Sequence, residues 1–113
     1  LVRTNLGIGE SASFDGGISW SAGNDTGLGG PNSRFFIKKL ISGNLLLINH
    51  VNFTGRNNLT ALISRDDGAS WEGGLLLDGR GDVSYPDAAQ APTGEVYAIY
   101  DRERYGAGEI LMA

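Results

Sequence analysis

Hydrophobic positions along the chain fall in short runs that glycine-rich segments interrupt. The middle of the chain contains four such runs: RFFIKKL (34–40), LLLINHV (45–51), LTALIS (59–64) and GLLLD (74–78). Each run has the length and the residue types of a single β-strand, and no stretch shows the 3.6-residue spacing of a helix. A turn such as ISGN between two runs is typical of a hairpin. The pattern therefore predicts a four-stranded antiparallel meander in an all-β chain.

One eight-residue phrase occurs twice. SFDGGISW begins at Ser13 and SRDDGASW begins at Ser64, so both fit Ser-x-Asp-x-Gly-x-Ser-Trp with an offset of 51 residues. The same offset places Gly43 of the SGN turn on Gly94 of PTGE, and it places LLLIN on VYAIY. Because a turn, a strand and the phrase share one offset, the chain contains a repeated structural unit.

A strand-only repeat of about 50 residues is typical of a β-propeller blade. We therefore predict a partial β-propeller with one complete four-stranded blade and parts of the two flanking blades. In this interpretation LVRT and GESASF are strands of the first blade, EILMA is the third strand of the last, and both ends of the chain lie inside a blade. The predicted units are the end of one blade (1–32), the complete blade (33–79) and the start of the next (80–113).

Each copy of the phrase is expected to form the turn between the third and fourth strands of a blade. The Asp and Ser side chains can bond the free amides of the turn, the Gly accepts a positive φ, and the Trp packs into the sheet. No further carboxylates cluster with either Asp, which favours a structural role over catalysis or calcium binding. The residues of the two turns are Ser13, Asp15, Gly17, Trp20, Ser64, Asp66, Gly68 and Trp71.

Charge and composition exclude several classes of function. The formal net charge is −4, and the Lys and Arg residues are scattered rather than gathered in a basic stripe, which argues against a nucleic-acid partner. The chain has no cysteine, so it can form neither a disulfide nor a thiolate metal site. No apolar run approaches the roughly 20 residues of a membrane helix. We expect no metal and no cofactor.

Neighbouring strands of a meander reverse direction, so the two phrases are expected at one rim of the sheets and another set of residues at the opposite rim. An isolated Arg in a loop is usually solvated, but several guanidinium groups at one rim favour a carboxylate ligand held by paired hydrogen bonds. This rim is therefore predicted to bind a small anionic ligand. Its candidate residues are Arg3, Arg34, His50, Arg56, Tyr85 and Asp101.

The repeated phrase resembles the Asp-box, or BNR repeat, of the sialidase (neuraminidase) superfamily. The first 20 residues resemble the segment of that family in which an Arg-Ser/Thr pair precedes an Asp-box. Further along, GRNNLTALISRDDGASW (55–71) and SYPDAAQAPTGEVYAIYDR (84–102) resemble the segments that carry another active-site Arg and the catalytic Tyr. Asp-boxes also occur in propellers that are not sialidases, so the resemblance depends on the ordered combination of the three segments.

The resemblance implies a six-bladed propeller of which this chain covers about the C-terminal third. Position by position, Arg3 and Arg56 match two of the three arginines that bind the sialic acid carboxylate, and Tyr85 matches the nucleophile. Asp101 falls where the family often has a Glu that orients an arginine. Arg34 matches no family position and is a candidate subsite residue. His50 is a candidate at the rim, although a structural contact fits it better than an acid/base role.

The resemblance also implies a reaction. A sialidase releases terminal sialic acid with retention through a tyrosyl intermediate, because a neutral phenol is not repelled by the substrate carboxylate. The family's general base, acid and first arginine are expected before Leu1, so the isolated chain is predicted to be inactive. The leading hypothesis is thus that the chain is part of a sialidase-like glycoside hydrolase that acts on sialylated glycans or other anionic sugars.

Two alternatives remain open: a glycan-binding propeller without catalysis, and a scaffold propeller without a sugar site. Open blade edges further predict self-association. The compartment is not determined by the sequence, and only the family resemblance favours a secreted or cell-surface protein.

Overall fold

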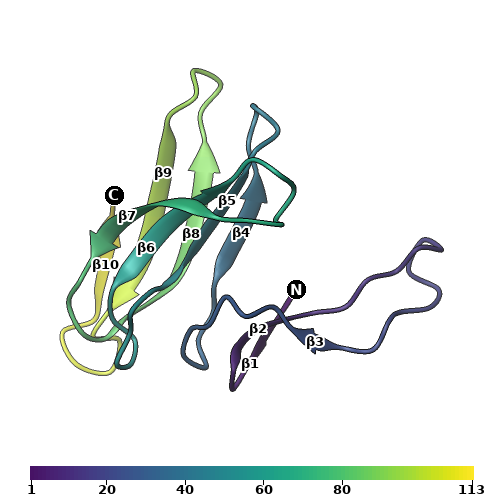
Figure 1. Cartoon of the computed structure of the whole chain (residues 1–113). Helices are drawn as coiled ribbons and strands as arrows, with labels where there is room; N and C mark the ends of the chain where they lie inside the picture. Colours follow the sequence, from purple (N-terminus) through teal and green to yellow (C-terminus); the bar gives the residue numbers. More distant parts are fainter.

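The structure, a computed structural model, describes residues 1–113 and consists of ten β-strands in three antiparallel sheets (Figure 1). It contains no helix that could cross a membrane. This architecture confirms the predicted all-β, partial β-propeller fold. The strands are β1 (Val2–Thr4), β2 (Gly7–Glu10) and β3 (Asn24–Asp25) in the first sheet; β4 (Phe36–Lys39), β5 (Leu45–His50), β6 (Leu59–Ser64) and β7 (Glu72–Asp78) in the second; and β8 (Val83–Gln90), β9 (Val96–Arg102) and β10 (Glu109–Met112) in the third.

The middle sheet is the predicted meander, with the strand order β4-β5-β6-β7. The third sheet repeats the first three strands of the middle sheet. The repeat includes individual hydrogen bonds in the turns. Gly43 donates its amide to the Leu40 carbonyl at 2.9 Å, and Gly94 donates to the Ala91 carbonyl at the same distance. Both glycines have a positive φ, 90° and 107° respectively, which a residue with a side chain rarely adopts. The 51-residue offset of the sequence is therefore a structural period.

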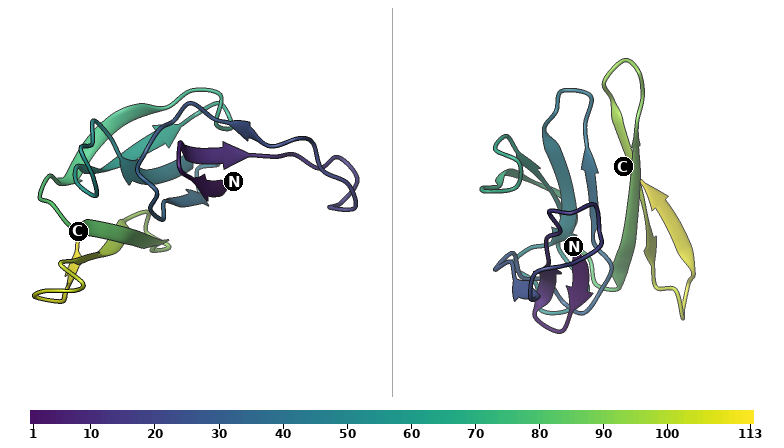
Figure 2. Two further views of the ribbon diagram at one scale, coloured as in Figure 1. Left: turned by 90° about the horizontal axis from the view of Figure 1, so that it is seen from below. Right: turned by 90° about the vertical axis from the view of Figure 1, so that its right-hand side faces the viewer.

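The second and third sheets lie side by side, with their first strands β4 and β8 adjacent (Figure 2). Hydrogen bonds join the sheets near both ends of these strands. Near one end the Val83 amide donates to the Arg56 carbonyl at 3.0 Å, and near the other the Ile41 amide donates to Gln90 Oε1 at 2.8 Å. Neighbouring propeller blades are arranged in this way around an axis. The division of the chain into blades at 32/33 and 79/80 stays a prediction.

The hydrophobic core lies between the second and third sheets. It is formed by six buried residues, and β5 contributes buried side chains to both of its faces, because Leu47 is as completely buried as its neighbour Ile48. A strand that is covered on both faces loses the alternation of apolar and polar residues, which explains the continuous run LLLI at 45–48. The core residues are Leu46, Ile48, Leu59, Val83, Ala98 and Tyr100.

The first sheet is the smallest, and one of its connections projects from the molecule. β2 ends at Glu10, so the strand predicted for GESASF is wrong from Ser11 onward, and the segment 11–23 forms an arm (Figure 1). The side chain of Trp20 is 64% exposed, which corrects the prediction that it packs into a sheet. Trp71 is half-buried and lies with Leu45 and Gly68 in one hollow. The difference arises because β3 pairs with β2 over only two residues and offers the arm no sheet to pack on.

The two phrases fold into the same hydrogen-bonded turn. In the first, the Ser13 hydroxyl accepts from the Gly17 amide at 2.8 Å and donates to Asp15 Oδ1 at 2.8 Å. In the second, the Ser64 hydroxyl makes the equivalent bonds to Gly68 and Asp66 at the same distances. The φ angles of Gly17 and Gly68 are 91° and 90°. The repeated residues therefore specify a turn whose bonds are made almost entirely within the eight residues.

Candidate functional site

Side chains from three separate parts of the chain meet at Tyr85. Arg3 Nη1 donates a hydrogen bond to the Tyr85 hydroxyl at 3.3 Å, although the two residues are 82 positions apart. The guanidinium carbon of Arg56 lies 5.6 Å from the centre of the Tyr85 ring, and that of Arg104 lies 3.9 Å from it. The structure thus brings Arg3, Arg56 and Tyr85 together, and it adds Arg104.

The site lies at the rim opposite the turn of the second phrase. In the middle sheet, His50 pairs with Leu59 at the end of β5 from which the Arg56 loop departs, whereas Ser64 pairs with Leu45 at the other end. The second phrase begins at Ser64, so the full length of β5 and β6 separates its turn from the Arg56 loop. The meander topology accordingly keeps the second phrase away from Tyr85.

The backbone of Tyr85 is in an unusual conformation. Its φ is 53°, and the pairing of β8 with β9 shifts register between Ser84 and Asp87. A bulge of this kind redirects a side chain, and Pro86 suits it because proline has no amide to offer the ladder. Pro86 is itself fully buried. Backbone strain that surrounding packing maintains is a recurrent feature of functional sites.

Arg56 is carried by the loop between β5 and β6, and His50 supports that loop. The Nδ1 atom of His50 lies 2.8 Å from the Asn57 carbonyl oxygen, which can only accept, so Nδ1 carries the proton. Burial lowers the pKa of His50, whose side chain is only 1% exposed. His50 thus supports the Arg56 loop from a buried position at the end of β5, and its expected place in the ligand site stays a prediction. The Arg56 guanidinium also donates to the Asn32 carbonyl at 3.2 Å.

Asp101 and Ser84 hold Arg104. Asp101 Oδ1 accepts a hydrogen bond from the Ser84 hydroxyl at 2.6 Å, and Asp101 Oδ2 lies 3.2 Å from Arg104 Nη2. Arg104 Nη2 also donates to Ser84 Oγ at 2.8 Å. The sequence pattern did not single out Arg104 or Ser84, because Arg104 lies beyond the end of β9 at Arg102 and its bond to Ser84 joins residues 20 positions apart. Asp101 does bind an arginine, but one that follows it in the chain.

Arg34 lies in the same hollow as Arg3 and Tyr85, which has a volume of about 390 Å³. Its guanidinium is 3.6 Å from the Asp87 carboxylate, and both side chains are about half exposed. An exposed pair at this distance contributes little to stability. Arg34 is thus placed beside the site with its charge offset by Asp87.

The charges around Tyr85 are unbalanced. Arg34 and Arg104 each pair with an Asp, whereas Arg3 and Arg56 have no carboxylate partner. The hydrogen bond from Arg3, followed by the neighbouring Arg104 guanidinium, lowers the pKa of Tyr85. The site therefore combines a phenol that ionises more readily than usual with two arginines that are free to bind an anion.

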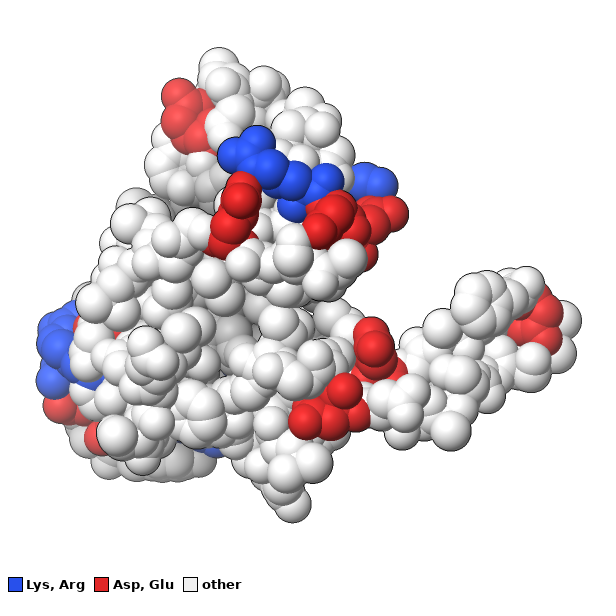
Figure 3. Space-filling view, viewed as in Figure 1, with Lys and Arg blue, Asp and Glu red and all other residues white.

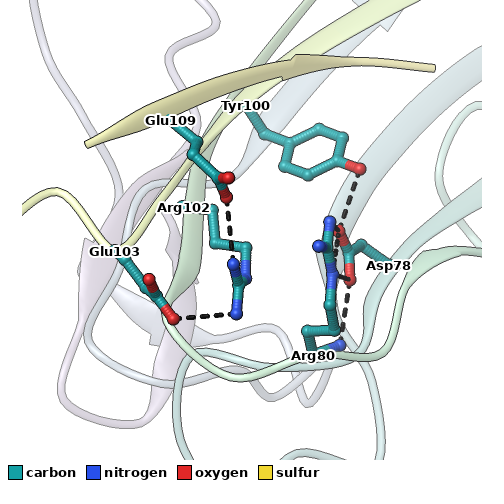
Figure 4. Close-up of polar contacts among 6 residues, drawn as sticks. All are labelled: Asp78, Arg80, Tyr100, Arg102, Glu103 and Glu109. Carbon is teal, nitrogen blue, oxygen red and sulfur yellow. Dashed lines mark hydrogen bonds and ion pairs between the residues drawn. The ribbon is translucent and has the colours of Figure 1, made fainter. Parts of the chain in front are cut away.

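Two further polar clusters make no hydrogen bond to Tyr85, although Glu103 lines a hollow together with Arg56 and Arg104. Asp78, Arg80 and Tyr100 form one, and Arg102 lies between Glu103 and Glu109 in another (Figure 4). No group of three His, Asp or Glu side chains is arranged to hold a metal ion. In the first phrase the Ser19 hydroxyl and amide hold the pKa of Asp15 at about 2, so this carboxylate is fully used by its turn.

Comparison with known protein families gives one match. A family model described as a BNR repeat-like domain matches residues 1–98, which include both phrases, Arg3, Arg56 and Tyr85. Searches among curated proteins and among solved structures find no match to the chain.

Proposed function

Because this chain belongs to the BNR repeat-like family, we propose that the rim around Tyr85 binds the carboxylate of a sialylated glycan or another anionic sugar as part of a sialidase-like site. One observation carries the proposal: Arg3 and Arg56 lie on Tyr85 from different sheets, and neither has a carboxylate partner. Guanidinium groups without an internal counter-ion are suited to bind a ligand carboxylate.

The same arrangement suits Tyr85 to nucleophilic attack. In a retaining sialidase-type reaction the phenol oxygen forms a bond to the anomeric carbon while the glycosidic bond breaks, and water later releases the sugar. The phenol proton must pass to a base, and the leaving oxygen must receive a proton from an acid. Arg3 stabilises the phenolate because it donates directly to the Tyr85 oxygen. The residues of this chain would thus supply the nucleophile and part of the carboxylate site.

One observation favours the second candidate, a glycan-binding site without catalysis. No carboxylate hydrogen-bonds to the Tyr85 hydroxyl, and the nearby Asp101 is occupied by Ser84 and Arg104. A phenol without an adjacent base binds a ligand but attacks it slowly. The two candidates share the carboxylate site and differ only in turnover.

Binding is tested by titrating the full chain with methyl α-sialoside and following amide shifts by NMR. We expect Arg3→Gln to weaken binding by about tenfold, which corresponds to the loss of one charge-assisted hydrogen bond. The matched control is Arg65→Gln, since Arg65 pairs with Glu72 beside the second phrase, at the other rim. Equal affinity of the Arg3 and Arg65 variants, or equal binding of methyl galactoside, would contradict the proposal.

Turnover is tested on a fluorogenic sialoside. We expect the full chain alone to release no fluorophore, because no base contacts Tyr85. We also expect Tyr85→Phe to leave sialoside binding largely unchanged. Release that Tyr85→Phe abolishes would instead identify the chain as a complete hydrolase. Release that survives this substitution would reject Tyr85 as the nucleophile.

A further inference from the structure

We propose that Arg104 is a positioning residue for Tyr85: its guanidinium, clamped by Asp101 and Ser84, covers the phenol ring and keeps the hydroxyl directed at Arg3. The role of Tyr85 in a reaction rests on the proposed function, but the positioning itself does not. It concerns how the ring is held.

Arg104 lies closer to the Tyr85 ring than Arg56 does. Its guanidinium carbon lies 3.9 Å from the ring centre, which is stacking distance, whereas the Arg56 guanidinium carbon is at 5.6 Å. Arg3 reaches only the hydroxyl. Arg104 is therefore the cation nearest to the face of the ring.

Arg104 is itself held firmly. Its Nη2 atom is shared between Ser84 Oγ at 2.8 Å and Asp101 Oδ2 at 3.2 Å, while Ser84 bonds Asp101 at 2.6 Å. Ser84 is 3% exposed and immediately precedes Tyr85. This closed triangle of bonds fixes the plane of the guanidinium relative to the backbone from which the Tyr85 side chain departs.

The loop that carries Arg104 is also anchored. It follows β9, and the carbonyl of Glu103 accepts two bonds, from the amides of Gly106 and Gly108, both at 2.8 Å. The Glu103 amide donates to the Asp82 carbonyl at 3.0 Å, which ties the loop to the residues that precede β8. Arg104 thus sits on backbone that is bonded to the start of the strand that carries Tyr85.

Charge distinguishes Arg104 from the two ligand-binding arginines. Its charge is offset by Asp101, so it is not free to bind a substrate carboxylate as Arg3 and Arg56 are. A planar cation that is neutralised on one edge still stacks on an aromatic ring. The contacts of Arg104 therefore suit it to position the Tyr85 ring rather than to bind the ligand.

Ring contact is tested by NMR of the full chain, without any sugar. The Arg104 side-chain Nε–H resonance should be shifted upfield by the Tyr85 ring, and Tyr85→Leu should return it to the range of the other arginines. The Arg102 resonance should not respond, because Arg102 lies between Glu103 and Glu109 (Figure 4). An unshifted Arg104 resonance in the unmodified chain would overturn the proposal.

The electrostatic consequence is tested by titrating the four tyrosines with ¹³C-labelled phenol rings and assigning Tyr85 from its loss in Tyr85→Phe. The charged groups around Tyr85 include Arg3 from β1, Arg34 before β4, Arg56 from the β5–β6 loop, Asp87 from β8, Asp101 from β9 and Arg104 itself. Asp82 and Glu103 line a hollow together with Arg56 and Arg104.

Arg104→Gln should raise the pKa of Tyr85 toward that of an ordinary tyrosine, because it removes the cation and leaves Asp101 unpaired. Arg104→Lys, which keeps the charge but not the planar fork, should raise it less. Arg102→Gln is the matched loss of one positive charge and should leave Tyr85 unchanged. Equal responses to Arg102→Gln and Arg104→Gln would contradict the proposal. These results stand whether or not the chain binds methyl α-sialoside, so failure of the proposed function is recognised separately.

Discussion

At the scale of single residues, Asp78 shows how strongly this fold uses a buried carboxylate. Its side chain is almost fully buried, its Oδ2 atom accepts from Arg80 Nη2 at 2.6 Å, and the Tyr100 hydroxyl donates to the same oxygen at 3.0 Å (Figure 4). The hydrogen bonds from Arg80 are the main cause that lowers the pKa of Asp78 to about 2. Asp78 thereby joins the end of β7 to β9 in the next sheet.

This lowered pKa predicts a loss of stability in acid. The folded chain binds the Asp78 proton less tightly than the unfolded chain, so the contribution is fully present above pH 4 and disappears as the pH falls toward 2. We expect Asp78→Asn to lower the free energy of unfolding at pH 7 by about 2 kcal/mol and to flatten its pH dependence between pH 4 and 2. Urea unfolding at several pH values measures this.

The control for this prediction is Asp67→Asn. Asp67 is exposed, makes no ion pair and has a φ of 59°, which Asn adopts readily. It should change the stability by less than about 0.5 kcal/mol. If both variants had the same pH dependence, Asp78 would not be the group responsible.

At the scale of elements, the two Asp-box turns have the same internal bonds but different surroundings. The second joins β6 to β7, and its Ser64 is completely buried. The first lies on the arm, where Phe14 is 96% and Ile18 is 88% exposed. The phrase therefore forms its turn locally, and the neighbouring sheet decides whether the turn contributes to the stability of the whole domain.

This difference predicts unequal effects of one substitution. Ser64→Ala leaves the Gly68 amide without its partner and should lower the global free energy of unfolding by about 1–2 kcal/mol. Ser13→Ala removes the same bond from the arm and should leave the global value nearly unchanged, while it speeds hydrogen exchange within 13–20. Denaturant unfolding and exchange together test this. Equal losses of global stability would show that the arm is part of the cooperative unit.

At the scale of the whole molecule, apolar surface remains uncovered. Exposed side chains include Leu75 (67%) on β7 and Ile110 (81%) on β10, both on strands at the edge of a sheet. In the view of Figure 3 the charged residues gather near the ends of the strands and at the tip of the arm, with a broad uncharged surface between them. Open edges and apolar faces of this kind favour association with further sheets.

We therefore predict that the chain self-associates. Sedimentation over a concentration series should show dissociation on dilution, and added salt should not weaken the association, because few charges lie on the contacting surface. Ile110→Glu on the free edge of β10 should reduce association, whereas Ile41→Glu, at another exposed position in the β4–β5 turn, should not. A stable monomer at all concentrations would contradict the prediction.

The sequence alone determined the features that depend on residues close in the chain. The repeated phrase and the turns at Gly43 and Gly94 make their bonds within a few residues, and the middle strands follow directly from the apolar runs between the turns. The BNR repeat-like family was also evident from these local motifs. Neighbouring strands of a meander reverse direction, and this alternation alone placed Arg3, Arg56 and Tyr85 at the same rim of the sheets.

Only the tertiary structure decided what each side chain contacts. His50 and Asp101 occupy equivalent positions of the repeat, yet His50 is buried under its own loop and Asp101 holds Arg104. Trp20 and Trp71 end the same phrase, but only Trp71 has a sheet behind it. These outcomes depend on the stacking of one sheet on the next, which joins residues far apart in the chain. A pattern read over one period contains no information about such contacts, because burial and pairing are set by the neighbouring sheet.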